Sequence, residues 1–330
     1  MPELTAAIET AAGLARVAAM PAGETLAAMV RAIETDGDAA RGEQIYRRAD
    51  LLCTSCHAIA GAGGQVGPDL TSIGASAPAD YLLESLVDPQ ARVKEGYQVV
   101  NVTRRNGTVA AGILVRDGTA DIALRDGADN VITIPTAEIA SRTVSPTSLM
   151  PPGLTAQLRR DEFLDLAKFL SRLGATGGAT VPNERVVRRW QILAADQAIS
   201  ARLREEGMGY AARPGAPLPW RAAYSTVAGT LPLGEVSVVG YFNPMRYRVV
   251  KFEIDASQAG AATLDFGADH GLTIWLDGQA ASLAGQTATF NLAPGRHVVT
   301  VAIDIAAFPL DALRVRLDRA AGGVQLVSGK

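Results

Sequence analysis

The pentapeptide Cys53-Thr54-Ser55-Cys56-His57 limits, more than any other segment, what this chain can fold into. C-x-x-C-H is the attachment motif for c-type haem. Two cysteines three residues apart on one helical turn can reach the two vinyl groups of a porphyrin, and the next residue can direct its imidazole at the iron. We therefore predict one covalent haem c on Cys53 and Cys56, with His57 as an iron ligand.

Two other uses of a C-x-x-C pair fit this sequence less well. A zinc site needs further ligands, but the chain has only two cysteines, and its other histidines, His270 and His297, lie far along the chain. A thioredoxin-like redox pair needs a βαβ context, which the sequence around Cys53 lacks.

The segments on either side of the motif predict a helical domain over residues 36–174. In Gly37–Arg48, Gly42 and Tyr46 are four residues apart and therefore lie on one face of a helix. The apolar stripe within Thr155–Leu173 predicts a closing helix.

The hydrophobic period changes from helical to alternating in the middle of this domain. Alternating apolar residues are separated by the turn pairs Asn106-Gly107, Asp117-Gly118 and Asp126-Gly127. This pattern predicts strands joined by hairpins, as a small β insertion at about 97–143.

Three further zones complete the chain. Residues 1–35 are Ala-rich with apolar positions at helical spacing, and they predict an N-terminal helical segment. Gly174–Thr180 is rich in small residues and is expected to be a linker, so we assign 175–219 to a linker and helical connector. Residues 220–330 contain short strands and turns, which predict a β-sandwich.

The helical domain resembles a class I cytochrome c element by element. The resemblance implies that the Pro68 carbonyl, in Gly67-Pro68-Asp69-Leu70, accepts the Nδ1–H of His57. It also implies that Met150, just before the closing helix, is the second axial ligand, which would raise the reduction potential relative to a second histidine. A Met filling a gap in the core is the alternative for Met150.

For other residues near the predicted haem, the sequence allows more than one role. Met20 and Met29 sit at helical spacing and are expected in the core, although they are the next candidates for the axial position. Arg92 and Lys94 could neutralise haem propionates or could be ordinary surface charges.

Residues 38–173 also resemble the haem-binding C-terminal region of large exported proteins of Planctomycetes and Verrucomicrobia. Residues 181–190, 264–278 and 292–304 resemble segments that follow this region in the same family. The resemblance implies a multidomain α+β chain: a class I cytochrome c-like helical domain with a small β insertion, followed by an all-β jelly-roll-like sandwich.

Sandwiches of this kind often bind carbohydrate by stacking an exposed aromatic ring on a sugar face. Trp275, Trp220, Tyr241 and His270 could serve in this way, or the two tryptophans could belong to the core. The strand around Trp275 is expected to have one buried and one exposed face. The buried face carries Leu272, Ile274 and Leu276, and Trp275 is expected on the exposed face.

Composition and the first residues narrow the partners and the location. Hydrophobic residues make up 48% of the 330 residues. The net charge is −3, so we expect no nucleic-acid partner. No apolar run reaches the ~18 residues of a membrane span, so we expect no transmembrane segment. Met1–Met20 lacks the pattern of a signal peptide. Because c-type haem is attached outside the cytoplasm, we expect a periplasmic or otherwise extracytoplasmic protein, present here as a fragment or without its leader.

These features together imply a monohaem c-type cytochrome that carries electrons to or from a redox partner protein, with a sugar dehydrogenase as one donor. An electron carrier needs no catalytic residue set, and none is legible in the sequence. Two alternatives stay open: a haem peroxidase with an open iron position, if Met150 is not a ligand, and a carbohydrate-binding module with an accessory haem.

Overall fold

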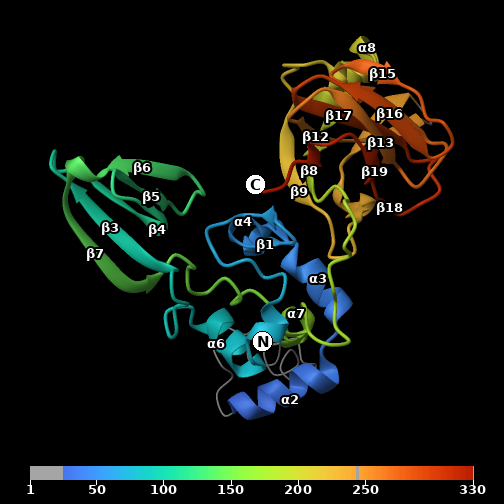
Figure 1. Ribbon diagram of the computed structural model, residues 1–330. Helices are drawn as coiled ribbons and strands as arrows, with labels where there is room; N and C mark the ends of the chain where they lie inside the picture. The colour runs from blue at the N-terminus through green and yellow to red at the C-terminus, as the bar shows by residue number, and fades with distance from the viewer. Residues whose placement is uncertain (1–24, 243–244, 330) are drawn as a thin grey trace. The chain divides into compact units, whose positions relative to one another are not determined.

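The computed structural model describes residues 25–242 and 245–329, and the chain divides into two compact units, Met1–Thr180 and Val181–Lys330 (Figure 1). The first unit is mainly helical with one sheet, and the second is mainly antiparallel sheet, so the chain is of the α+β class. No helix within the described residues is long and apolar enough to cross a lipid bilayer.

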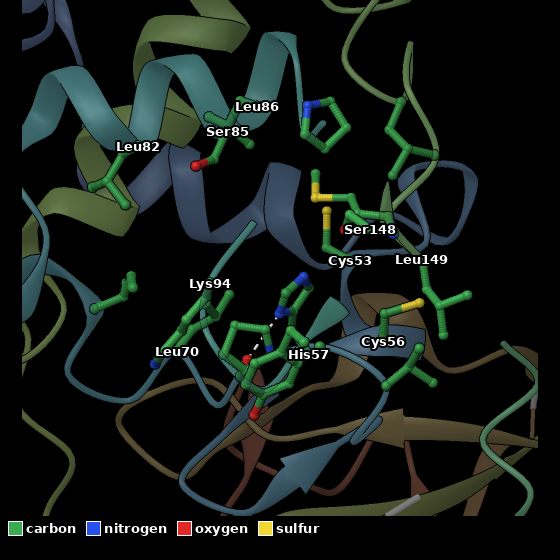
Figure 2. A pocket seen from close by; sticks show the side chains of 18 of the residues that line it. Cys53, Cys56, His57, Leu70, Leu82, Ser85, Leu86, Lys94, Ser148 and Leu149 are labelled. Atoms are coloured by element: carbon green, nitrogen blue, oxygen red, sulfur yellow. Dashed lines mark hydrogen bonds between the residues drawn. The ribbon is translucent and has the colours of Figure 1, made fainter. Parts of the chain in front are cut away.

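Helix α7 (Arg160–Arg172) is the centre of the first unit, because its buried residues form the surface on which the other helices pack. Helices α4, α6 and α7 also contribute side chains to one cavity (Figure 2). The helices around α7 are α2 (Leu26–Asp36), α3 (Ala39–Tyr46), α5 (Ile73–Ser76) and α6 (Ala79–Val87), and the one-turn α4 (Cys53–Cys56) carries the motif.

Two boundaries of this unit differ from the sequence expectation. The closing helix begins at Arg160 and not at Thr155, because the Thr155 hydroxyl donates to the Leu86 carbonyl (3.0 Å) and holds that segment in turns. Helix α2 buries Met29 and packs on α6 and α7, so the described part of residues 1–35 lies within the same compact unit as the motif. The first part of that expected helical segment, with Met20, lies outside the described residues.

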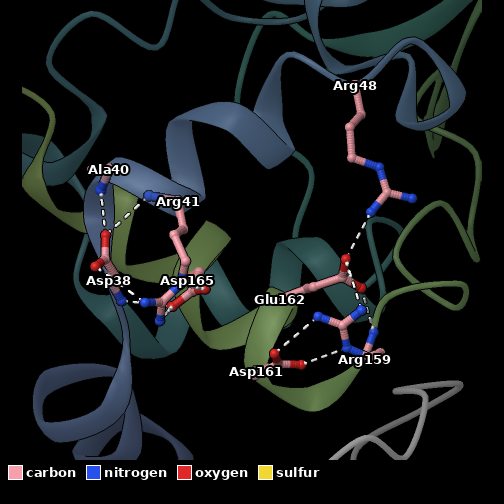
Figure 3. Close-up of polar contacts among 8 residues, drawn as sticks. All are labelled: Asp38, Ala40, Arg41, Arg48, Arg159, Asp161, Glu162 and Asp165. Carbon is pink, nitrogen blue, oxygen red and sulfur yellow. Dashed lines mark hydrogen bonds and ion pairs between the residues drawn. The ribbon is translucent and has the colours of Figure 1, made fainter.

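A buried carboxylate joins α3 to α7. Asp165 accepts from the backbone N–H of Asp38 (2.6 Å) and from the Arg41 guanidinium (2.8 Å), and its side chain is only 3% exposed (Figure 3). The two helices approach closely because Gly42 has no side chain: a Cβ there would lie 2.0 Å from the Asp165 carbonyl oxygen. Next to this crossing, the rings of Tyr46 and Phe169 pack at 5.6 Å between centroids.

The β insertion is one five-stranded antiparallel sheet in the order β6-β5-β4-β3-β7. It extends to Ser148 rather than to about 143, because the last strand continues to pair with the first through Gln98 and Ser148. Its strands are β3 (Gln98–Arg104), β4 (Val109–Asp117), β5 (Asp121–Arg125), β6 (Val131–Pro135) and β7 (Ile139–Ser148).

The segment Gly174–Thr180 is a closed turn and not an extended linker. The Gly174 N–H donates to the Ala179 carbonyl (3.0 Å), and the Ala179 N–H donates to the Arg172 carbonyl at the end of α7 (3.0 Å). Glycine at positions 174 and 177 permits the positive φ that this turn requires.

The second unit is a sandwich of two antiparallel sheets around a shared core that includes Phe252, Leu264, Phe290 and Leu317. The jelly-roll assignment of this sandwich remains a prediction. The larger sheet contains β15 (Gln279–Ala281), β14 (Leu272–Leu276), β17 (Gly295–Asp304), β12 (Met245–Ala256), β8 (Arg189–Leu193) and β9 (Trp220–Tyr224), with β11 (Val238–Phe242) and β20 (Val324–Leu326) also on β12. The smaller sheet contains β16 (Thr287–Leu292), β13 (Gly260–Asp265) and β19 (Arg316–Ala320).

The expected helical connector over 175–219 is only partly helical. Strand β8 lies inside the larger sheet between β12 and β9, and it buries Trp190 and Ile192 in the sandwich core. Helix α8 (Gln197–Glu206) and the 3₁₀ turn η3 (Met208–Ala212) then pack on the outer face of the same sheet. In the sequence, β8 is a short apolar run with no clear alternation, and such a run is compatible with either a strand or a helix.

Because α8 and η3 cover the outer face of the larger sheet, Trp275 is not on an exposed face, contrary to expectation. Trp275 is only 8% exposed, because residues of α8 and η3 form a second hydrophobic cluster with it. His297, in the neighbouring strand β17, is also held by contacts within this unit. Its side chain is 12% exposed, with Nδ1 2.7 Å from Asp277 Oδ2 and Nε2 2.8 Å from the Ala293 carbonyl oxygen.

We predict that Gly42→Ala lowers the free energy of unfolding of the first unit by roughly 1–3 kcal/mol. Alanine favours helix over glycine by about 1 kcal/mol, but a Cβ 2.0 Å from a backbone oxygen forces α3 away from α7. Denaturant unfolding followed by helical circular dichroism measures the change. Gly127→Ala is the control, because a Cβ there meets open space; equal stabilities of the two variants would contradict the prediction.

The His297 contacts predict a pH dependence of stability in the second unit. The Ala293 carbonyl and the Asp277 carboxylate both accept from the protonated imidazole and raise the pKa of His297 in the folded state. This contribution is complete below the pKa of the unfolded chain and is lost as the pH rises through the folded pKa. From about pH 5.5 to about pH 8.5, the melting temperature of wild type should therefore fall more than that of His297→Gln; parallel curves would argue against it.

Candidate functional site

The motif forms a single helical turn that places both cysteines at one cavity. Leu52, with φ of 57°, reverses the chain immediately before α4, and the His57 N–H donates to the Cys53 carbonyl at its end (2.8 Å). Figure 2 shows Cys53, Cys56 and His57 gathered at the same cavity. The two thiols are not joined in a disulfide, and burial raises the pKa of Cys53 to about 11.

The imidazole of His57 is held by its neighbours in the form that a metal needs. Its Nδ1 lies 2.8 Å from the Pro68 carbonyl oxygen, which can only accept, so Nδ1 carries the proton and Nε2 keeps its lone pair. Burial lowers the pKa of His57 below its ordinary value and keeps the ring neutral, against the opposing effect of the Pro68 carbonyl. The Tyr46 hydroxyl also donates to the His57 backbone carbonyl (3.0 Å).

Glycines in the loop after the motif allow it to pack directly on α4 and on the imidazole. A Cβ at Gly64 would lie 1.9 Å from the Ser55 carbonyl oxygen, and a Cβ at Gly67 would lie 2.3 Å from Cε1 of His57. The sequence showed the Gly61–Gly67 run but not this role. The presence of Gly67 directly before Pro68 is the signal that could have indicated it.

The cavity has an apolar lining and opens to solvent. Together with the open space at its mouth, it encloses roughly 1210 Å³. Besides the motif residues, the lining side chains come mainly from the loop after the motif, from α6 and α7 and from the segment around residue 150. The apolar ones include Val66, Pro68, Leu70, Ile73, Leu82, Leu86, Ile113, Leu149, Pro151, Leu154, Leu166 and Leu170.

Met150 lines the same cavity as His57, although β3 to β7 separate them in sequence. The loop that carries it is held by Gln90, which the sequence reasoning missed. The Gln90 side-chain amide accepts from the Ser148 N–H (2.8 Å) and donates to the Met150 carbonyl (3.1 Å). Met29 is buried in α2, and Met208 and Met245 belong to the second unit.

Arg92 and Lys94 also line the cavity and add positive charge to it. Arg92 pairs with Glu84, and its guanidinium lies over the Tyr81 ring, 5.0 Å from the centroid. The Lys94 ammonium lies 5.9 Å from the centroid of the Tyr97 ring.

This donor set fits a covalently attached haem. Two thiols at C-x-x-C spacing suit the vinyl groups, and a neutral imidazole with a free Nε2 and a thioether suits the iron. The apolar lining suits the porphyrin, and the two cations suit its carboxylates.

Within the part of the chain that the structure describes, the residues considered for carbohydrate stacking do not form a comparable site. Trp275 lies beneath η3, where a Cβ on Gly209 would be 3.7 Å from the indole nitrogen. The Trp220 ring lies under the Lys251 ammonium, 4.2 Å from the centroid. His270 is exposed and bonded to Asp269, and the side chain of Tyr241 lies outside what the structure describes.

Comparison with known proteins gives one family match and only weak structural likenesses. Residues 39–123 match the family model for cytochrome c, and no curated protein matches the chain. The chain is similar to a family two carbohydrate esterase from Clostridium thermocellum in complex with cellohexaose (14% identity, 28% of this chain and 31% of that chain, TM-score 0.16). It is also similar to a β-glucosidase from Kluyveromyces marxianus in complex with glucose (11%, 43% and 16%, TM-score 0.21) and to an anti-sigma factor domain-containing protein (9%, 72% and 79%, TM-score 0.22).

The structural likenesses carry no argument about fold, and the chain spans less than a third of the length of the esterase and of the glucosidase. The family match is different, because it runs from the start of α3 into β5 and includes the motif and the Pro68 loop. Within its first unit, the chain therefore contains a cytochrome c-like haem-binding domain.

Proposed function

We propose that the protein is a monohaem c-type cytochrome that transfers electrons outside the cytoplasm. The observation that carries the proposal is a single cavity lined by two thiols and a neutral imidazole from the Cys53–His57 segment and by the thioether of Met150 from a distant segment. When bound, the haem supplies reversible one-electron exchange between ferrous and ferric iron.

Each cavity residue has a defined part in this proposal. Cys53 and Cys56 would hold the haem through thioether bonds, and His57 would ligate the iron through Nε2. The Pro68 carbonyl fixes the imidazole orientation and raises its basicity. Met150 would supply a thioether ligand to the iron, which would favour the reduced state relative to a second histidine.

Electron exchange with a partner protein requires one part of the cavity to reach the surface. Leu52 meets this need, because it lines the cavity and is 49% exposed. We propose a dehydrogenase, with a sugar dehydrogenase as the first choice, as the electron donor. The need for haem attachment outside the cytoplasm supports a periplasmic or otherwise extracytoplasmic location.

The two alternative functions have less support. A peroxidase needs an open iron position, whereas Met150 lines the cavity and its loop is held by Gln90. A carbohydrate-binding module needs an exposed aromatic platform, whereas Trp275 is buried.

We predict that the chain, expressed with cytochrome c maturation machinery, carries one covalent haem. Denaturing mass spectrometry should show the chain plus one haem, since both thiols lie at the cavity. The double variant Cys53→Ser and Cys56→Ser should lose the covalent mass. Haem that extracts from wild type into acidified organic solvent would overturn the assignment.

We predict that Met150→Ala abolishes the weak long-wavelength sulfur-to-iron band of the oxidised protein and speeds cyanide binding at least tenfold. The reason is that removal of the thioether opens the sixth position of the iron. Met245→Ala is the matched control, because Met245 is 41% exposed and lies in the second unit. An unchanged spectrum in Met150→Ala would place the ligand elsewhere, with Met20 and Met29 the next to substitute.

A further inference from the structure

The turn between β5 and β6 reaches from the β insertion to the loop that follows the haem motif. Asp129 Oδ2 accepts from the backbone N–H of Gln65 (3.2 Å), and Arg125 Nη2 donates to the side-chain carbonyl of the same Gln65 (2.8 Å). Both the main chain and the side chain of one loop residue are therefore held by two residues some sixty positions later in the sequence.

The ion pair that makes these contacts is partly buried and geometrically constrained. Arg125 and Asp129 lie 2.5 Å apart, with side chains 16% and 5% exposed. Asp129 adopts a positive φ of 72°, which is uncommon outside glycine and persists where surrounding contacts determine it. An ion pair of this kind is weak evidence for stability, so its contacts with Gln65 are the feature to explain.

The residue that this pair holds lies directly beside the proximal haem contacts. Gln65 is two residues before Gly67, which packs against the His57 ring, and three before Pro68, whose carbonyl takes the Nδ1–H of His57. Backbone hydrogen bonds from Gly64 to Thr54 and from Gly67 to Cys56 fix the flanks of this stretch. Asp129 and Arg125 fix its middle.

We propose that Arg125 and Asp129 are positioning residues for the proximal ligand. They hold the loop at Gln65 so that the Pro68 carbonyl stays at hydrogen-bonding distance from His57, and they thereby lower the reduction potential of the bound haem. The direction follows from the bond, because an Nδ1–H that donates makes the imidazole a stronger donor to ferric iron. The inference rests on the proposed function, since it concerns the potential of that haem.

The variants Arg125→Ala and Asp129→Gly separate this role from ordinary stability. Glycine removes the carboxylate and accepts the positive φ, so the backbone conformation of the turn is retained. Arg116→Ala is the matched control, because Arg116 forms an ion pair with Asp121 on the same sheet but is 57% exposed.

Two measurements on the full chain test the proposal. Amide hydrogen exchange over residues 61–68, with and without haem, should speed up at least tenfold in Arg125→Ala and Asp129→Gly and stay unchanged in Arg116→Ala. Potentiometry of the haem-loaded chain should show a higher potential in the same two variants, with the Met150 band retained.

The outcomes separate this inference from the function on which it rests. Exchange rates equal to those of Arg116→Ala would show that the contacts do not hold the loop, and would overturn the inference. Faster exchange with an unchanged potential would overturn it as well, because the loop would then not govern the Pro68 contact. A wild-type chain that takes up no haem would overturn the proposed function, and the role in potential with it.

Discussion

The hydrogen bond from His57 Nδ1 to the Pro68 carbonyl is the constraint on which the site depends. It fixes the tautomer of the ring and leaves Nε2 for the iron. The bond forms only because the loop between the two residues folds back on α4, which glycines at 64 and 67 permit by having no Cβ. The opposite side of the cavity has its own anchor in Gln90, which holds the loop of Met150.

The β insertion links these two sides of the cavity. Its last strand, β7, ends at Ser148 and leads directly to Met150, while the turn between β5 and β6 contacts Gln65 on the proximal side. A sheet with a core of its own is a rigid way to bridge two loops that would otherwise be joined by a long flexible connection. The β insertion therefore connects the loop that carries Met150 to the loop that carries Gln65.

The second unit is organised around the long strand β12. One edge of β12 pairs with β17 from Tyr247 to Ala256, and its other edge is shared among β11, β8 and β20. Short strands from both ends of the unit thus meet on one strand, which explains why residues 189–193 belong to the sandwich and not to a connector. The outer face of this sheet is covered by α8 and η3, and that cover buries Trp275.

The local features of this protein could be predicted from its sequence. The spacing of Cys53, Cys56 and His57 indicates haem attachment, and turn pairs such as Asn106-Gly107 indicate the hairpins, because both depend on residues that are neighbours in the chain. Contacts between residues far apart in the sequence could be identified only in the folded chain: Gln90 with Met150, Asp129 with Gln65, and η3 over Trp275. These contacts join polar or aromatic side chains with no periodic pattern, and their partners are set by how sheets and helices pack rather than by any local preference.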